Sequence, residues 1–166
     1  MRQQFQTRPE LDEDLSLLSL DEPFAPFAVP VAADPQVSIV IPIHGKLAYT
    51  LACLRSLVRH GAQVPFEVIV VDDASADDSA SVLAQVDGIR LLRNQSNLGF
   101  IDSCNAGAAA AHGEFLLFLN NDTQVTAGWL DALLRCFAER ADCGIAGSRL
   151  VYPDGRLQEA GGLVFA

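Results

Sequence analysis

The chain has 166 residues, half of them hydrophobic, and a formal net charge of −10 at pH 7. This length and apolar content suit one domain with one buried core, and the negative charge argues against nucleic acid or an anionic lipid surface as a partner. No apolar run approaches the roughly 20 residues that cross a bilayer, and no charged-then-apolar leader marks a secretion signal. We therefore expect no membrane span in this segment. The expected location is the cytoplasm, either free or at the inner face of the cell membrane.

Residues 1–36 form an acidic leader that carries seven acidic residues, two basic residues and five of the eight prolines. This composition discourages long regular structure. We predict a linker or loosely packed leader over residues 1–36 and one folded domain over residues 37–166. The apolar ending at residues 161–166 favours a domain that is incomplete at its C-terminus.

The folded part begins with four alternating units of strand and helix. Apolar, largely β-branched runs predict strands over residues 37–43, 66–71, 89–92 and 114–119, and the first is expected to stop at Pro42. Apolar residues at helical spacing predict a helix after each strand. The first helix is expected to end at a capping Gly61, and the second to open at a capping box of Ser75 and Asp78.

A turn at Pro153-Asp154-Gly155 predicts two short extended pieces near the end of the chain. The four cysteines show no C-x-x-C spacing, so packing as small hydrophobes is favoured over a metal site or disulfides. The alternation of strands and helices implies an α/β fold with a largely parallel sheet.

Ligands of such sheets lie beyond the carboxyl ends of the strands. Asp72 and Asp73 directly follow an apolar strand, where buried carboxylates are costly unless they are hydrogen-bonded. Both are predicted to accept hydrogen bonds from a base or ribose. The alternative for Asp73 is a helix cap.

The cluster Asn120-Asn121-Asp122 follows the fourth strand. Mg²⁺ often takes one or two protein carboxylates together with phosphates and waters, so Asp122 is the candidate metal ligand. The alternative is a simple turn, because Asn and Asp tolerate left-handed backbone. Arg93 is a candidate phosphate ligand or a solvated surface charge, and His44 is a candidate nucleotide contact or a surface residue.

Four segments taken in order resemble the family-2 glycosyltransferases of GT-A fold: Val37–Pro42, Val70–Ser75, Asn97–Phe100 and Gly113–Thr123. The resemblance covers residues 37–160. It includes the Tyr152–Gly155 turn seen in rhamnosyltransferase-like members of the family.

This resemblance implies a truncated GT-A domain, which is a Rossmann-like, mainly parallel sheet flanked by helices. It implies that the end of the first strand and Asp72 hold the nucleobase, that Asn120 faces the ribose, and that Asp122 coordinates Mg²⁺ or Mn²⁺ on the diphosphate. Asn120 stands where the family commonly has Asp, a variant that is familiar in the rhamnosyltransferase-like branch. The full set of expected nucleotide-binding residues is Pro42, Ile43, His44, Asp72, Asp73, Arg93, Asn97, Gly99, Asn120 and Asn121.

The function implied is a donor domain that transfers a sugar, with inversion, from a UDP- or dTDP-sugar to a glycan, lipid-linked or protein acceptor. The family's catalytic base lies in the acceptor-binding half, so the catalytic residue is expected outside this chain, and Glu159 reads as a solvated acid. The alternative is a module that binds nucleotide sugars without transferring them. No G-x-G-x-x-G or G-x-x-x-x-G-K-[ST] follows any strand, which argues against dinucleotide and P-loop enzymes.

Overall fold

The computed structural model describes residues 17–160, and the termini that carry the start of the acidic leader and the apolar ending lie outside this range. The described chain forms two compact units. The larger unit is Leu18–Asp131, and the smaller contains residue 17 and residues 132–160. The predicted boundary between leader and domain at residues 36 and 37 stays a prediction.

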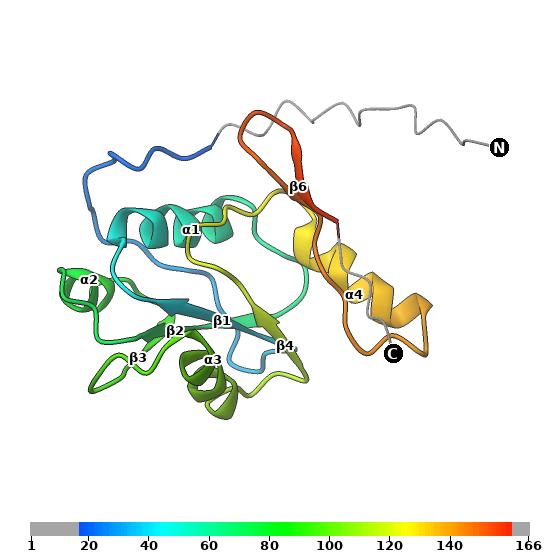
Figure 1. The fold of residues 1–166 in the computed structure, drawn as a ribbon. Coiled ribbons are helices and arrows are strands. Elements are labelled where there is room, and N and C mark those ends of the chain that lie inside the picture. The colour runs from blue at the N-terminus through cyan, green and yellow to red at the C-terminus, as the bar shows by residue number, and fades with distance from the viewer. Residues whose placement is uncertain (1–16, 161–166) are drawn as a thin grey trace. The chain divides into compact units, whose positions relative to one another are not determined.

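The larger unit contains a four-stranded sheet built from β1 (Val37–Ile43), β2 (Phe66–Asp72), β3 (Ile89–Arg93) and β4 (Phe115–Phe118). The strand order is β3-β2-β1-β4, and every neighbouring pair is parallel (Figure 1). This confirms the predicted parallel α/β architecture, with each strand within one or two residues of its expected position.

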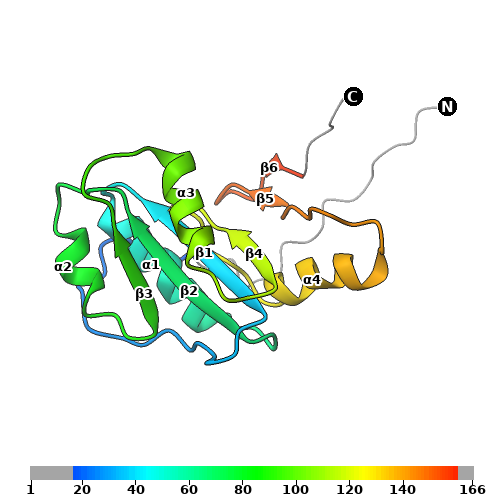
Figure 2. The ribbon, with the colours of Figure 1, turned by 90° about the horizontal axis from the view of Figure 1, so that it is seen from below.

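Helices lie on both faces of this sheet. The structure has α1 (Leu47–Arg59), α2 (Ser79–Leu83), α3 (Phe100–Ala109) and α4 (Trp129–Glu139). Figures 1 and 2 show α1 and α3 on opposite faces. This follows from the strand order, because the chain moves outward from β1 to β3 and then returns past β1 to β4, and crossovers of one hand then place the helices on opposite sides.

Pro42 does not stop β1, which continues to Ile43. In β1, the carbonyl of Ile43 faces β2 and the carbonyl of Val40 faces β4, so the nitrogen of Pro42 also points to the β4 side. The pairing between β1 and β4 ends at Val40 and Phe118. Pro42 is therefore tolerated in a central strand because no acceptor on β4 needs its missing N–H.

Small residues bring α3 close to the sheet. Gly107 is buried against β1 and β2, and a Cβ added to it would overlap with Val40 Cγ1 and lie 3.1 Å from Val71 Cγ2. Val40 and Val71 are fully buried and pack with partly buried alanines of α3 and the turn after it. The helix thus approaches the strands at a distance that only glycine permits at this position.

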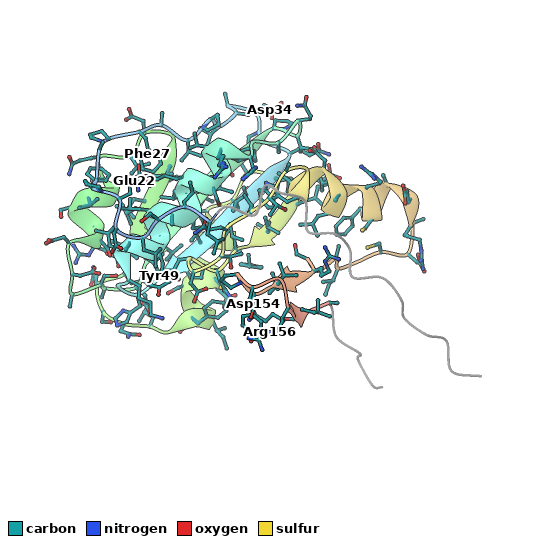
Figure 3. The ribbon with its side chains drawn as sticks, turned by 90° about the horizontal axis from the view of Figure 1, so that it is seen from above. Glu22, Phe27, Asp34, Tyr49, Asp154 and Arg156 are labelled. Atoms are coloured by element: carbon teal, nitrogen blue, oxygen red, sulfur yellow. The ribbon has the colours of Figure 1, made fainter. Side chains whose placement is uncertain are left out.

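Residues 18–36 belong to the larger unit and contain no helix or named strand. Val29 is buried, its amide donates to the carbonyl of Asp87 (2.9 Å), and the amide of Asp87 donates to the carbonyl of Phe27 (3.0 Å). Arg55 of α1 lies 3.3 Å from Glu22 and stacks 5.6 Å from the ring centre of Phe27, two residues labelled in Figure 3. This part of the acidic segment is held by main-chain hydrogen bonds rather than by regular structure.

A polar cluster joins the amino ends of β1 and β2 to the turn after α3. The Ser38 hydroxyl donates to Glu67 (2.6 Å), the amide of His112 donates to Glu67 (2.7 Å), and Arg90 forms an ion pair with Glu67. The amide of Gly113 donates to Ser38 (2.9 Å). Partial burial alone would raise the pKa of Glu67, but these hydrogen bonds and the charge of Arg90 outweigh it and lower the pKa.

Besides the stop at Pro42, three local predictions were wrong. The cap of α1 is His60, and Gly61 does not take a left-handed backbone. Ser75 and Asp78 form no capping box, because α2 begins at Ser79 without a side-chain cap from Asp78. Of the four free cysteines, Cys53 and Cys104 are buried as expected, whereas Cys136 is exposed.

The smaller unit contains the predicted hairpin. Its strands are β5 (Leu150–Val151) and β6 (Leu157–Glu159), which pair antiparallel. The turn closes with the amide of Gly155 donating to the carbonyl of Tyr152 (2.8 Å), and Gly155 has a φ of 81°. Arg156 pairs with Asp154 (2.7 Å) and stacks on Tyr152 (5.5 Å to the ring centre), and Figure 3 labels the charged pair.

Replacing Gly107 with Ala tests the close approach of α3. Overpacking a buried contact usually costs about 1–3 kcal/mol, and the better helix propensity of Ala offsets only part of this. We expect Gly107→Ala to lower the free energy of unfolding in urea. Gly61→Ala is the control, because a Cβ at Gly61 meets nothing within 4 Å; an equally stable Gly107→Ala would contradict the proposed contact.

Glu67 predicts acid-sensitive stability. Its folded-state pKa lies below the ordinary value of 4.5, so its contribution is present above that pH and is lost as the pH falls through the folded pKa. Glu67→Gln should cost about 1–3 kcal/mol at pH 7, since buried donors then lose a charged acceptor. The difference from the wild type, measured by urea unfolding from pH 7 to pH 3, should shrink towards acid pH, and a difference that stays constant would refute this origin.

Candidate nucleotide site

The carboxyl edge of the sheet contains a topological switch point. The chain leaves β1 towards β2 on one side and returns to β4 on the other, so the loops after β1 and β4 diverge. In open α/β sheets the crevice at such a point is the usual ligand site. His44 follows β1 and Asn120–Asp122 follow β4, which places these two predicted groups on either side of the switch point, with Asp72 and Asp73 one strand away.

Asp72 is the fully buried last residue of β2. Its Oδ1 accepts a hydrogen bond from the amide of Ser75 (2.9 Å). Its Oδ2 is buried without a hydrogen-bond partner, although Nε of Arg93 lies 3.3 Å away as an ion pair. A buried carboxylate oxygen without a hydrogen bond is costly, so this atom is suited to receive an N–H or O–H from a ligand.

Arg93 lies over the turn that follows β2. Its side chain is 56% exposed, and besides the ion pair with Asp72 it donates to the carbonyl of Ser75 (3.4 Å). The guanidinium therefore contacts the buried carboxylate with one side and solvent with the other. This arrangement is compatible with a phosphate contact as well as with a surface charge.

Both carboxylate oxygens of Asp73 accept hydrogen bonds from other groups of the protein. The Asn94 side-chain amide and the Leu98 main-chain amide donate to Oδ1, and the amide of Gly99 donates to Oδ2, each at 2.8 Å. Burial alone would raise the pKa of Asp73, but these donors, together with Ser103, lower it. The carboxylate thus organises the loop before α3 instead of capping α2, and its predicted contact with nucleotide stays a prediction.

His44 and Asn97 meet across this edge. The Nδ1–H of His44 donates to the carbonyl of Asp73 (2.8 Å), which leaves Nε2 as an acceptor for the Asn97 side-chain amide (3.4 Å). Asn97 also accepts a hydrogen bond from the amide of Gly99 (3.0 Å), the residue that caps α3 with a φ of 88°. The predicted residues His44, Asn97 and Gly99 are therefore joined in one network with Asp73.

The loop after β1 is held by residues that were not among the predicted nucleotide-binding residues. Gly45 and Lys46 both have positive φ, and the amide of Gly45 donates to the Ser75 hydroxyl (2.7 Å). Asp77 accepts hydrogen bonds from the amides of Ser79 and Leu47, which lower its pKa against the effect of burial. Sequence spacing offers no signal for Asp77, because it joins two loops that are 30 residues apart.

The remaining predicted residues differ in accessibility. Pro42 and Ile43 are buried in β1, so only their main-chain atoms could reach a ligand. Asn120 and Asp122 are exposed, and the side-chain amide of the half-buried Asn121 donates to Thr50 of α1 (3.0 Å). The turn closes with the amide of Thr123 donating to the carbonyl of Asn120 (3.1 Å), so both the turn and an exposed carboxylate are present.

Asp122 fits a cation that is shared with a substrate. Among residues 17–160, no group of three or more His, Cys, Asp or Glu side chains could hold a metal ion. A metal here would need ligands beyond the side chains of the described residues, as when Mg²⁺ binds one carboxylate together with phosphates and waters. A single exposed carboxylate at a switch point meets that requirement.

Comparison with known proteins identifies the family of this chain. The profile of glycosyl transferase family 2 matches residues 38–162. The O-antigen biosynthesis protein RfbC of Myxococcus xanthus is 34% identical over 141 residues, which cover 81% of this chain and 11% of RfbC. This chain therefore belongs to glycosyl transferase family 2.

Solved structures agree with this fold. S. aureus TarS 1–349 in complex with UDP-GlcNAc superposes with a TM-score of 0.55 and 25% identity, covering 63% of this chain and 31% of TarS. The mannosyltransferase PcManGT of Pyrobaculum calidifontis, solved with GDP-Man and Mn²⁺, has a TM-score of 0.56 and 22% identity, covering 72% of this chain and 36% of its own. These matches confirm the GT-A fold.

The chain spans 11% to 34% of the length of the first curated relatives that it matches. In the described residues, no helix is both long and apolar enough to cross a bilayer.

Replacing Asp73 with Asn tests its role in organising the site. One carboxylate oxygen becomes an N–H group that faces a donor, so either Gly99 or the Asn94–Leu98 pair loses its acceptor. We expect amide hydrogen exchange at Leu98 and Gly99 to accelerate and the free energy of unfolding to fall by about 1–3 kcal/mol. Asp102→Asn, at an exposed acid of α3, should change neither, and unchanged exchange in Asp73→Asn would exclude the role.

Proposed function

We propose that this chain is the donor-binding part of an inverting glycosyltransferase that uses a UDP- or dTDP-sugar. The observation that carries the proposal is that two carboxylates in different environments lie at the same edge of the sheet. Asp72 offers a buried oxygen without a hydrogen bond, and Asp122 offers an exposed charge on the other side of β1. A nucleoside diphosphate has the complementary groups, since its base donates N–H and its diphosphate attracts a cation.

In this proposal, the base and ribose bind near β1 and β2. Asp72 accepts a hydrogen bond from the base, and Arg93 moves away from Oδ2 towards solvent or phosphate as the ligand enters. Its side chain is 56% exposed, so solvent is accessible to the guanidinium in this movement. The network of His44, Asn97 and Asp73 fixes the loop that borders the base, and Asn120 faces the ribose.

The diphosphate binds at the turn after β4. We assign Asp122 as the protein ligand of Mg²⁺ or Mn²⁺, and Asn121 as the residue that keeps the turn in place. When bound, the cation would neutralise the leaving nucleoside diphosphate as a Lewis acid. The chain's own contribution is to hold the carboxylate at the switch point.

Transfer also needs a base that deprotonates the acceptor hydroxyl. We assign that base to none of residues 17–160, because Glu159, the acid considered for it, lies on the exposed strand β6 of the smaller unit. Donor binding is thus proposed for this chain, and sugar transfer for a protein in which an acceptor-binding half supplies the base. RfbC, named for O-antigen biosynthesis, supports a saccharide or lipid-linked acceptor in envelope polysaccharide synthesis, as does the likeness to the rhamnosyltransferase-like branch.

Calorimetric titration of the chain with UDP and dTDP, with and without Mn²⁺, tests this proposal. Losing a hydrogen bond to a charged group costs about 1.5–3 kcal/mol, so Asp72→Asn should weaken binding about 10- to 100-fold under both conditions. Asp122→Asn should remove only the increase in nucleotide affinity that Mn²⁺ gives.

Glu114→Asn, at an exposed acid beside the amino end of β4, is the control and should bind like the wild type. A wild-type chain that binds neither nucleotide would mean that this segment shares only the fold of the family. Nucleotide-sugar binding without sugar transfer would favour the non-catalytic module.

A further inference from the structure

One face of α1 carries three buried polar side chains next to the turn after β4. Thr50 and Cys53 are 0% exposed and Ser56 is 1% exposed. Their spacing of three residues places them on one side of the helix. We call these three residues the α1 polar face. The rest of the buried surface of α1 includes Leu51, Leu54 and Leu57, as expected for a helix that covers a sheet.

Two residues of the α1 polar face contact the start of the turn. Thr50 accepts a hydrogen bond from the side-chain amide of Asn121 (3.0 Å), and Sγ of Cys53 lies 3.9 Å from the carbonyl of Asn120. Burial, and to a smaller degree the charge of Asp122, raises the pKa of Cys53 to about 12. The thiol therefore stays protonated and serves as a donor to the turn.

Ser56 contacts the other end of the turn. Its hydroxyl accepts a hydrogen bond from the amide of Val125 (3.0 Å) and donates to the carbonyl of Cys53 (2.6 Å). Both bonds are buried, where an unpaired amide or hydroxyl would be costly. Asp122 thus lies in a short segment that α1 holds on both sides, while its own carboxylate remains exposed.

We infer that Thr50, Cys53 and Ser56 are positioning residues that fix the Asn120–Val125 turn so that Asp122 presents its carboxylate to the cation of a nucleoside diphosphate. The inference rests on the proposed function, and it adds the part of the fold that controls affinity for the metal-bound ligand. The physical reason is preorganisation: a turn held before binding loses less conformational freedom when the ligand arrives.

The test uses Thr50→Val and Ser56→Ala, which remove a hydroxyl acceptor at each end of the turn. Thr50→Ser is the matched control that keeps the acceptor for Asn121. Ser38→Ala is the second control, because Ser38 is equally buried and hydrogen-bonded but lies at the opposite end of β1. All variants are made in the 166-residue chain. Their amide hydrogen-exchange rates are compared after correction for any change in the free energy of unfolding.

The first readout is amide hydrogen exchange, which needs no ligand. Thr50→Val and Ser56→Ala should accelerate exchange across residues 120–125 about three- to tenfold, the range expected for one lost hydrogen bond. Thr50→Ser and Ser38→Ala should exchange like the wild type there. Unchanged exchange in both test variants, or equal acceleration in Ser38→Ala, would overturn the inference.

The second readout is the affinity for UDP with and without Mn²⁺. In the test variants, the increase in UDP affinity that Mn²⁺ gives should be about three- to tenfold smaller than in the wild type. Their affinity for UDP without metal should be unchanged. Faster exchange with the full Mn²⁺ gain retained would show that the turn is held for stability alone, against the inference. A wild-type chain that binds no nucleotide under either condition overturns the proposed function instead, and exchange alone then decides whether α1 sets the turn.

Discussion

The constraint on which the structure depends is that β1 and β2 are buried on both faces. Their side chains are apolar apart from Ser38 and Glu67 at the amino ends and Asp72 at the carboxyl end of β2. Main-chain groups inside the sheet pair between strands, so the polar side chains of β1 and β2 lie at the two edges where strands meet loops. At the amino edge, the groups satisfy one another around Glu67. At the carboxyl edge, one buried oxygen of Asp72 remains without a hydrogen bond, and this difference is what makes that edge the candidate site.

The apolar pattern predicted the sheet well because a strand that is buried on both faces consists of consecutive apolar residues. The four strands were placed within one or two residues, and the residues that follow them were correctly assigned to one edge. Patterning failed where a long-range contact decides the outcome. Pro42 remains within β1 because β4 is short, and Ser75 holds Gly45 instead of capping α2. Neither fact is visible in the local sequence.

The same limit explains what could be predicted about the site. Asp72 and Asp73 are adjacent acids with the same sequence context, yet Asp73 accepts three hydrogen bonds from the loop before α3 and Asp72 keeps an oxygen unpaired. Their side chains alternate in direction, so one faces the loop that crosses over from β3 and the other faces Arg93. The sequence identified both as chemically important, but only the fold shows that Asp73 holds the loop before α3 while Asp72 keeps an oxygen without a hydrogen bond.

The short turn that carries Asp122 has one internal hydrogen bond across Asn120–Thr123. Hydrogen bonds from outside the turn add to it, from Thr50 and Ser56 of α1 and from Leu18, which pairs with Gln124. The N-terminal turn of α1 also borders the loop after β1 through Lys46 and Leu47. One helix thus contacts both sides of the switch point, so a change in α1 would reach the loop after β1 and the turn after β4 together. In the proposed function these two loops border the base and the diphosphate, and we therefore expect changes in α1 to affect both, because the loops share one support.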